Sequence, residues 1–206
     1  MATLLVGALG TACTQATASM AGAGTPMTPA ALQTTLNMLF QEHVYLAAAA
    51  TGAALGGRQA EFQAAAAALD QNSVAIAQAV GMVYGADAEK AFLPLWRRHI
   101  GFVVDYTVGL AGRDKAKQEQ AVNALLGYTD ELGAFLSSAN PNLSRAAVAD
   151  LVKHHILTLK EVIDAQAAGD VPRAYRALRT AAGHMQGIAT PLAQAIVKQF
   201  PEKFRG

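Results

Sequence analysis

Three histidines recur at a constant interval and are the residues of this chain best suited to chemistry. They are His43, His99 and His155, whose positions are equally spaced, and each follows a leucine by four positions. A constant period of this kind is typical of a fold that repeats one supersecondary unit. Because neutral imidazole is a common ligand of zinc, copper and iron, the spacing raises the question of whether the three side chains meet.

A second set of polar residues recurs with the same period. Asn72, Tyr128 and His184 are spaced as the three histidines are, each among apolar residues at three- and four-residue spacing. His43 and Asn72 lie almost equally far from Gly57 along the chain, one before it and one after it. Two antiparallel helices joined at that glycine would hold both side chains at one height. The spacing therefore predicts one polar layer in an otherwise apolar interior.

Two interpretations of this layer follow from the cost of burying polar groups, about 1–3 kcal/mol for each group left unpaired. In the first, the imidazoles bind a transition metal, copper, iron or zinc, or a small metal-containing cofactor, as inward-facing residues of helical bundles do. In the second, the histidines only satisfy core hydrogen bonds in a structural or protein-interaction module. A third alternative is an apolar ligand held between the Ala-rich helices. The candidate metal ligands are His43, His99, His155 and His184, with Asn72, Tyr128, Met185, Glu42 and His154 as supporting residues.

The elements that must position these residues are predicted to be helices. From Thr28 onward the chain is rich in Ala, Leu, Gln, Glu and Lys, so we expect an all-α domain over 28–206. Pro94 and Pro191 fall inside expected helices and predict a kink or a displaced boundary at each. The six antiparallel helices are expected at about 28–56, 58–83, 87–111, 114–139, 142–169 and 170–201. They form three degenerate hairpins of equal length, at about 28–84, 85–140 and 141–203, that either close into a bundle or stack as a short solenoid.

The segment 1–27 differs in composition from the rest of the chain and is expected to be an export signal or a disordered N-terminal segment. Leu4 to Ala12 is an apolar run followed by small and polar residues, which resembles the hydrophobic region of a secretory signal peptide. The run is too short to cross a bilayer, which takes roughly 20 residues. Cys13, the only cysteine, ends a phrase similar to a lipoprotein cleavage site, so a lipid anchor is an alternative. We expect a periplasmic, extracellular or membrane-anchored lipoprotein.

Composition and motifs argue against several classes of function. The net charge is +1 with no basic stripe, so the electrostatic footprint of a nucleic-acid-binding protein is missing. The sequence has no phosphate-binding loop, no Gly-x-Ser-x-Gly elbow and no Glu-x-x-His pair typical of di-iron bundles. A non-enzymatic binding protein is therefore expected in preference to an enzyme.

The phrases Glu42-His43-Val44, Arg98-His99-Ile100 through Thr107 and His184-Met185 are similar to a group of exported, all-helical bacterial proteins of uncharacterised activity. Some members of that group are associated with copper-amine-oxidase-type N-terminal modules. The resemblance covers about residues 30 to 203 and implies a helical fold and export. It does not imply oxidase activity, because nothing in the chain resembles a quinone-forming oxidase site.

Overall fold

The computed structural model describes residues 27–204, which form six long α-helices and one short 3₁₀ helix. The helices are α1 (Pro29–Leu55), α2 (Gln59–Tyr84), α3 (Ala86–Ala111), α4 (Lys115–Ala139), α5 (Arg145–Ala167), α6 (Val171–Gln199) and the 3₁₀ helix η1 (Pro201–Phe204). The all-α prediction is confirmed, and the expected helix boundaries agree to within three residues. The export segment and Cys13 lie outside the described residues.

Side-chain caps explain where four of the helices begin. Thr28, Asp114, Ser144 and Asp170 each accept a hydrogen bond from the backbone N–H three residues later. The first N–H groups of a helix have no partner inside the helix, so each cap stabilises its helix by about 1 kcal/mol. Thr, Ser and Asp are common N-cap residues, which is why a helix start at each of these positions could be predicted from the sequence.

Prolines inside two helices do not interrupt them. Pro94 lies within α3 and Pro191 within α6, and both helices are continuous through these positions. Of the two alternatives expected at each proline, the displaced boundary is therefore wrong, and the kink stays a prediction. Phe92 and Trp96, on either side of Pro94, are both buried, so the packing of α3 outweighs the lost backbone hydrogen bond.

One turn geometry joins the two helices of each hairpin. Gly57, Arg113 and Gly169 occupy equivalent places and have positive φ angles of 68°, 55° and 69°. In each turn the next N–H bonds back to the carbonyl five residues earlier, at 2.8–2.9 Å. Glycine adopts this left-handed conformation without penalty, whereas the Cβ of Arg113 makes it unfavourable.

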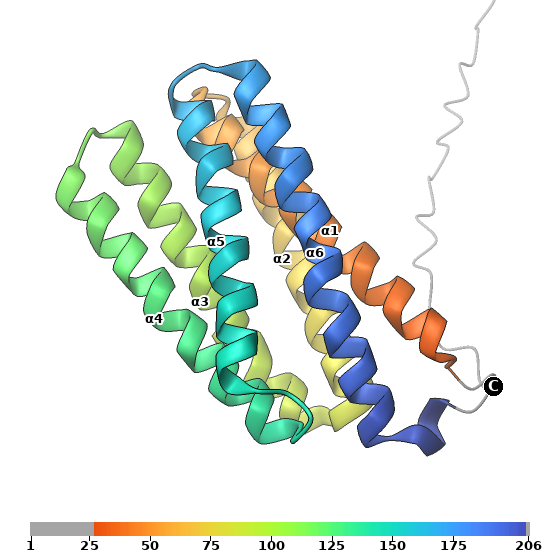
Figure 1. Cartoon of the computed structure of the whole chain (residues 1–206). Helices are drawn as coiled ribbons and strands as arrows, with labels where there is room; N and C mark the ends of the chain where they lie inside the picture. The colour runs from red at the N-terminus through yellow and green to blue at the C-terminus, as the bar shows by residue number, and fades with distance from the viewer. Residues whose placement is uncertain (1–26, 205–206) are drawn as a thin grey trace, which may run out of the picture.

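The helices close into a bundle (Figure 1). Each helix packs against its neighbours in the chain, α6 also packs against α1, and α1, α3 and α5 contact one another as well. The contact between the first and last helices distinguishes this arrangement from an open stack. The helices that carry His43, His99 and His155 are thus the ones that meet inside.

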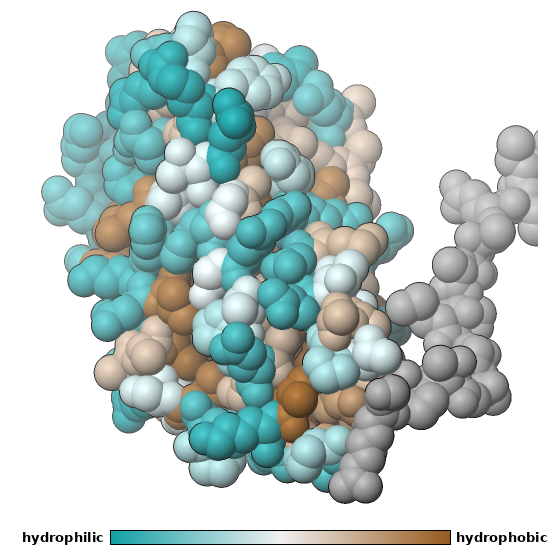
Figure 2. Space-filling view, turned by 45° about the vertical axis from the view of Figure 1, so that its right-hand side comes forward, coloured by the Kyte–Doolittle hydropathy of each residue, from teal (hydrophilic) through white to brown (hydrophobic). Residues whose placement is uncertain are grey.

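The exterior is largely polar. Hydrophilic residues predominate on the face shown in Figure 2, with apolar side chains scattered between them. Ion pairs such as Arg97–Asp70 and Arg173–Glu161, both at 2.7 Å, lie on the exposed surface of the bundle. Such pairs contribute at most about 1 kcal/mol each. None of the helices between residues 27 and 204 combines the length and apolarity needed to cross a bilayer.

We predict that Arg113→Gly stabilises the protein by about 0.5–1 kcal/mol, because it removes the penalty of a left-handed side-chain-bearing residue. Gly57→Ala is the reciprocal variant. An added Cβ at Gly57 would meet no atom within 4 Å, so its effect is confined to the backbone. We expect Gly57→Ala to destabilise the protein by a similar amount. Urea unfolding of the two variants checks both signs, and a loss of stability in Arg113→Gly would contradict the analysis of this turn.

Candidate metal centre

Three buried histidines from alternate helices meet at the centre of the bundle. His43 on α1, His99 on α3 and His155 on α5 have 1%, 4% and 5% of their surface exposed. One imidazole nitrogen from each lies within 4.8 Å of one from each of the other two. We call these three residues the histidine triad. Their equal spacing in the sequence places them at one height, and the contacts among α1, α3 and α5 bring them together.

The nitrogens of the triad are close to the spacing that a metal ion requires. The Nε2 atoms of His43 and His99 are 3.3 Å apart. Tetrahedral zinc, with Zn–N bonds of about 2.0–2.1 Å, holds its ligand nitrogens roughly 3.3 Å apart. The ring centroids of His43 and His155 are 5.8 Å apart, and the nitrogen of His155 lies within 4.8 Å of the other two. Two of three ligands are therefore already at coordination spacing.

Burial keeps the triad neutral. Desolvation holds the pKa of His43 well below its usual value, and the nearby His99 and His155 lower it further, because a positive charge on one ring disfavours a second on its neighbour. Burial and the neighbouring His155 lower the pKa of His99 to about 3, and burial with His184 lowers the pKa of His155 to about 4. At neutral pH all three rings are unprotonated, which is the form that binds metal.

The other ring nitrogens of the triad lack partners. The Nδ1 atoms of His43, His99 and His155 are buried without a hydrogen bond. The backbone of Trp96 lies near the His99 ring and partly offsets the lowering of the His99 pKa. The two groups do not form a hydrogen bond of normal geometry. Metal-binding histidines usually donate their second nitrogen to an acceptor, and among the described residues only the Trp96 backbone approaches one here, at His99. The triad therefore has unsatisfied binding capacity on more than one atom.

Aromatic rings surround the triad on one side. Trp96 meets His99 and His43 edge-on, with ring centroids 4.7 and 5.1 Å apart. Tyr128 lies against His99 at 5.0 Å and is itself 2% exposed. Burial raises the pKa of Tyr128, so its hydroxyl stays protonated, and this hydroxyl has no hydrogen-bond partner. Tyr128 was among the supporting residues predicted from the sequence, whereas Trp96 was not.

His184 does not join the triad, contrary to expectation. Its Nε2 lies 3.0 Å from the backbone carbonyl of Leu151, and its ring lies against that of His154, with centroids 4.1 Å apart. His154 is exposed, whereas Met185 is buried in the core. His184 was expected to lie level with the triad along the helices. It does not join the triad, because α6 is not one of the three helices, α1, α3 and α5, that meet at the centre of the bundle.

Asn72 likewise lies outside the triad, and its amide nitrogen is paired while its side-chain oxygen is not. Its side-chain amide donates to the backbone carbonyl of Leu39 at 2.9 Å and to the carboxylate of the exposed Glu42 at 2.7 Å. Both supporting residues thus bind each other at the rim of the layer. The predicted single layer is therefore an inner triad with Tyr128 beside it, and outer polar contacts at Asn72 and His184.

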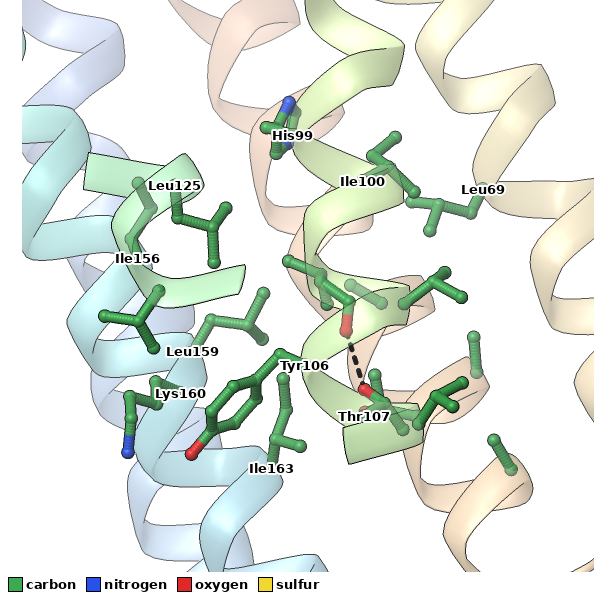
Figure 3. Close-up of a pocket in the computed structure, with 18 of the residues that line it drawn as sticks. Leu69, His99, Ile100, Tyr106, Thr107, Leu125, Ile156, Leu159, Lys160 and Ile163 are labelled. Atoms are coloured by element: carbon green, nitrogen blue, oxygen red, sulfur yellow. Dashed lines mark hydrogen bonds between the residues drawn. The ribbon is translucent and has the colours of Figure 1, made fainter. Parts of the chain in front are cut away.

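The triad separates two apolar cavities. The first, of about 210 Å³, lies toward the Gly57 and Gly112 turns, and Figure 3 shows His99 at one end of it and Tyr106, Thr107 and Lys160 at the other. Its walls are mainly aliphatic. The second, which we call the loop-side chamber, measures about 450 Å³ and extends toward the loop between α4 and α5. His99 and His155 belong to the walls of both cavities.

Comparisons with protein-family models, curated proteins and solved structures give no match for this chain. The resemblance to exported helical bacterial proteins therefore stays a prediction. Function is inferred from the geometry of the triad and its surroundings.

We predict that acid destabilises the metal-free protein mainly between pH 6.5 and 4. The unfolded histidines take up protons near 6.5, whereas the folded pKa values of His99 and His155 are about 3 and about 4. In this window the unfolded state binds more protons, so stability falls by about 1.4 kcal/mol per pH unit for each buried histidine. Urea unfolding from pH 7 to 4.5 measures the slope. His155→Gln should make it shallower, and an unchanged slope would contradict the role of burial.

Proposed function

We propose that this is an exported, non-enzymatic helical protein that binds a transition metal, zinc, copper or iron, through His43, His99 and His155. The observation that carries the proposal is the convergence of three buried imidazoles with nitrogens within 4.8 Å of one another. Histidine nitrogen suits each of these metals. Three protein ligands also leave a tetrahedral ion one position open to a further ligand.

The energetics of burial support this proposal. Each buried ring nitrogen without a partner costs about 1–3 kcal/mol, and the three rings have one such nitrogen each. A bound ion would give the converging nitrogen of each ring a ligand bond, which contributes favourable free energy against that cost. Because the rings are already neutral, no proton needs to leave them at physiological pH. Three neutral imidazoles that converge at the centre of the bundle support a cation site, because apolar core packing alone would not require them.

A second function has its own support. The His43 and His99 rings approach each other at 3.3 Å between Nε2 atoms, a distance at which one ring donates a hydrogen bond to the other. This contact would fix the register of α1 against α3 without any ion. In that case the protein is a structural or interaction module, and the triad only specifies its fold.

The proposal of export rests on the sequence of residues 1–27. Their short apolar run and small residues are typical of a secretory signal, and a lipid on Cys13 is the alternative attachment. Nearly all of this segment lies outside the described residues. Detection of the mature N-terminus by mass spectrometry of the exported fraction tests it.

We predict that chelator-treated protein takes up one Zn²⁺ or Cu²⁺ per chain in a calorimetric titration. His99→Ala should weaken binding by at least about 100-fold, because it removes a direct ligand rather than an outer contact. His154→Ala is the matched control: it removes an exposed imidazole outside the triad and should bind like the wild type.

The two functions give different results in this titration. Failure of the wild type to bind either ion would show the metal proposal to be wrong and leave the hydrogen-bonded module. Equal binding by wild type and His99→Ala would place the ion elsewhere, for instance at the outer pair of His154 and His184.

A further inference from the structure

Two histidines outside the triad lie ring against ring at the surface of the bundle. His154 on α5 is exposed and His184 on α6 is half-buried. The centres of their rings are 4.1 Å apart, and the ring planes are inclined by 35°. We call these two residues the outer pair. Because α5 and α6 pack against each other, the two rings are brought together by the fold of the third hairpin.

A hydrogen bond to the backbone determines which nitrogen of His184 can bind a metal. Its Nε2 lies 3.0 Å from the carbonyl oxygen of Leu151. A carbonyl oxygen only accepts, so Nε2 carries the proton, and in the neutral ring Nδ1 has the free lone pair. Metal-binding histidines usually donate their second nitrogen to a carbonyl or carboxylate in this way, which orients the ring. His184 is therefore already oriented as a ligand.

The Nδ1 atom of His184 also lies on an uncovered side of α6. A Cβ added at Gly187, almost one turn further along the helix, would lie 3.8 Å from this nitrogen. Gly187 is exposed, and so is Gly183, where an added Cβ would meet nothing within 4 Å. Neither position carries a side chain that could cover the ring. An ion from solvent can therefore approach Nδ1 beside Gly187.

The separation of the two rings favours one coordination geometry. A metal–nitrogen bond of about 2.0 Å places the centre of each ring about 3.1 Å from the ion, so two ring centres are about 4.4 Å apart at a right angle and about 5.1 Å apart at the tetrahedral angle. The outer pair, at 4.1 Å, is close to the first value. His43 and His99 of the triad, at 5.3 Å, are close to the second. Right-angled nitrogen ligands are typical of tetragonal Cu²⁺ sites.

The outer pair offers two protein ligands and leaves the other positions to water. Among residues 27–204, no group of three metal-ligating side chains includes either of its rings. The affinity of a nitrogen site for divalent ions generally rises to a maximum at Cu²⁺ and falls again at Zn²⁺. Copper is therefore the ion that two imidazoles and water hold best.

We propose that the outer pair is a second, solvent-open metal site, which binds Cu²⁺ through Nδ1 of His184 and one nitrogen of His154. This site does not depend on the proposed function of the triad, because neither residue belongs to the triad. Since it supplies two protein ligands where the triad supplies three, it binds copper more weakly than the triad does. Its copper equivalent therefore follows the one taken up at the centre of the bundle.

Cu²⁺ titrations of the chelator-treated full chain, followed by calorimetry and electron paramagnetic resonance, test this proposal. Wild type is expected to take up a copper equivalent at the outer pair whose spectrum shows two nitrogen ligands. His154→Ala and His184→Gln should each weaken this equivalent at least about tenfold, because each removes one of the two ligands. Zn²⁺ should bind the site at least about tenfold more weakly than Cu²⁺ does.

Gly187→Leu tests the assignment of Nδ1 without removing either imidazole. Long side chains on a helix point back over the preceding turn, so a leucine at this position would cover Nδ1 of His184. The variant should weaken the outer copper equivalent at least about tenfold. Leucine favours a helix more than glycine does, so the variant is expected to fold at least as stably as wild type. Gln186→Ala is the matched control: it changes an exposed neighbour on α6 and should bind copper like the wild type.

The proposal is overturned if wild type and His154→Ala bind Cu²⁺ equally, since the two rings would then only stack on each other. Equal copper binding by wild type and Gly187→Leu would overturn the assignment of Nδ1. These results are distinguishable from failure of the triad. A tight equivalent that is lost in His99→Ala, with no weaker copper equivalent, would leave the triad and remove the outer site. One copper equivalent that is lost in His154→Ala and kept in His99→Ala would do the reverse.

Discussion

The desolvation of three imidazoles at the centre of the bundle is the constraint on which the rest of the structure depends. Keeping His43, His99 and His155 away from water requires α1, α3 and α5 to touch one another. It also requires α2, α4 and α6 to cover them from outside. The contact between α6 and α1 completes that cover. A stack of three hairpins without this contact would expose one flank of the triad, and the rings would regain ordinary protonation behaviour.

The triad is packed against aromatic rings on one side and borders cavities on others. Phe40, Phe92 and Trp96 form a stacked aromatic group beside it, with centroids 5.4–6.2 Å apart. Beyond the triad on each side the interior is hollow, at about 210 and 450 Å³. Voids of this size sacrifice dispersion contacts that a filled core would gain. The stacked aromatic group, through Trp96, therefore packs against His43 and His99, whereas the two cavities leave the triad without such contacts on their sides.

The sequence predicted heights along the helices better than positions across the bundle. Caps at Thr28, Asp114 and Asp170 and the glycine turns set where helices begin and end, so the element boundaries followed from local chemistry. The constant period then placed six polar residues at one level. It could not predict that His184 would turn to the Leu151 carbonyl while Tyr128 would face His99. That difference depends on which neighbours each outer helix meets, and the cavities depend on side-chain volumes from all six helices, which no single stretch of sequence encodes.

His99 and His155 belong to the walls of both cavities as well as to the triad. A molecule bound in either cavity would therefore contact two of the three rings that are proposed to hold the ion. Linkage requires that whatever factor such a molecule applies to the affinity for the ion, the ion applies to the affinity for that molecule. The cavities and the proposed metal centre thus cannot be treated as thermodynamically independent.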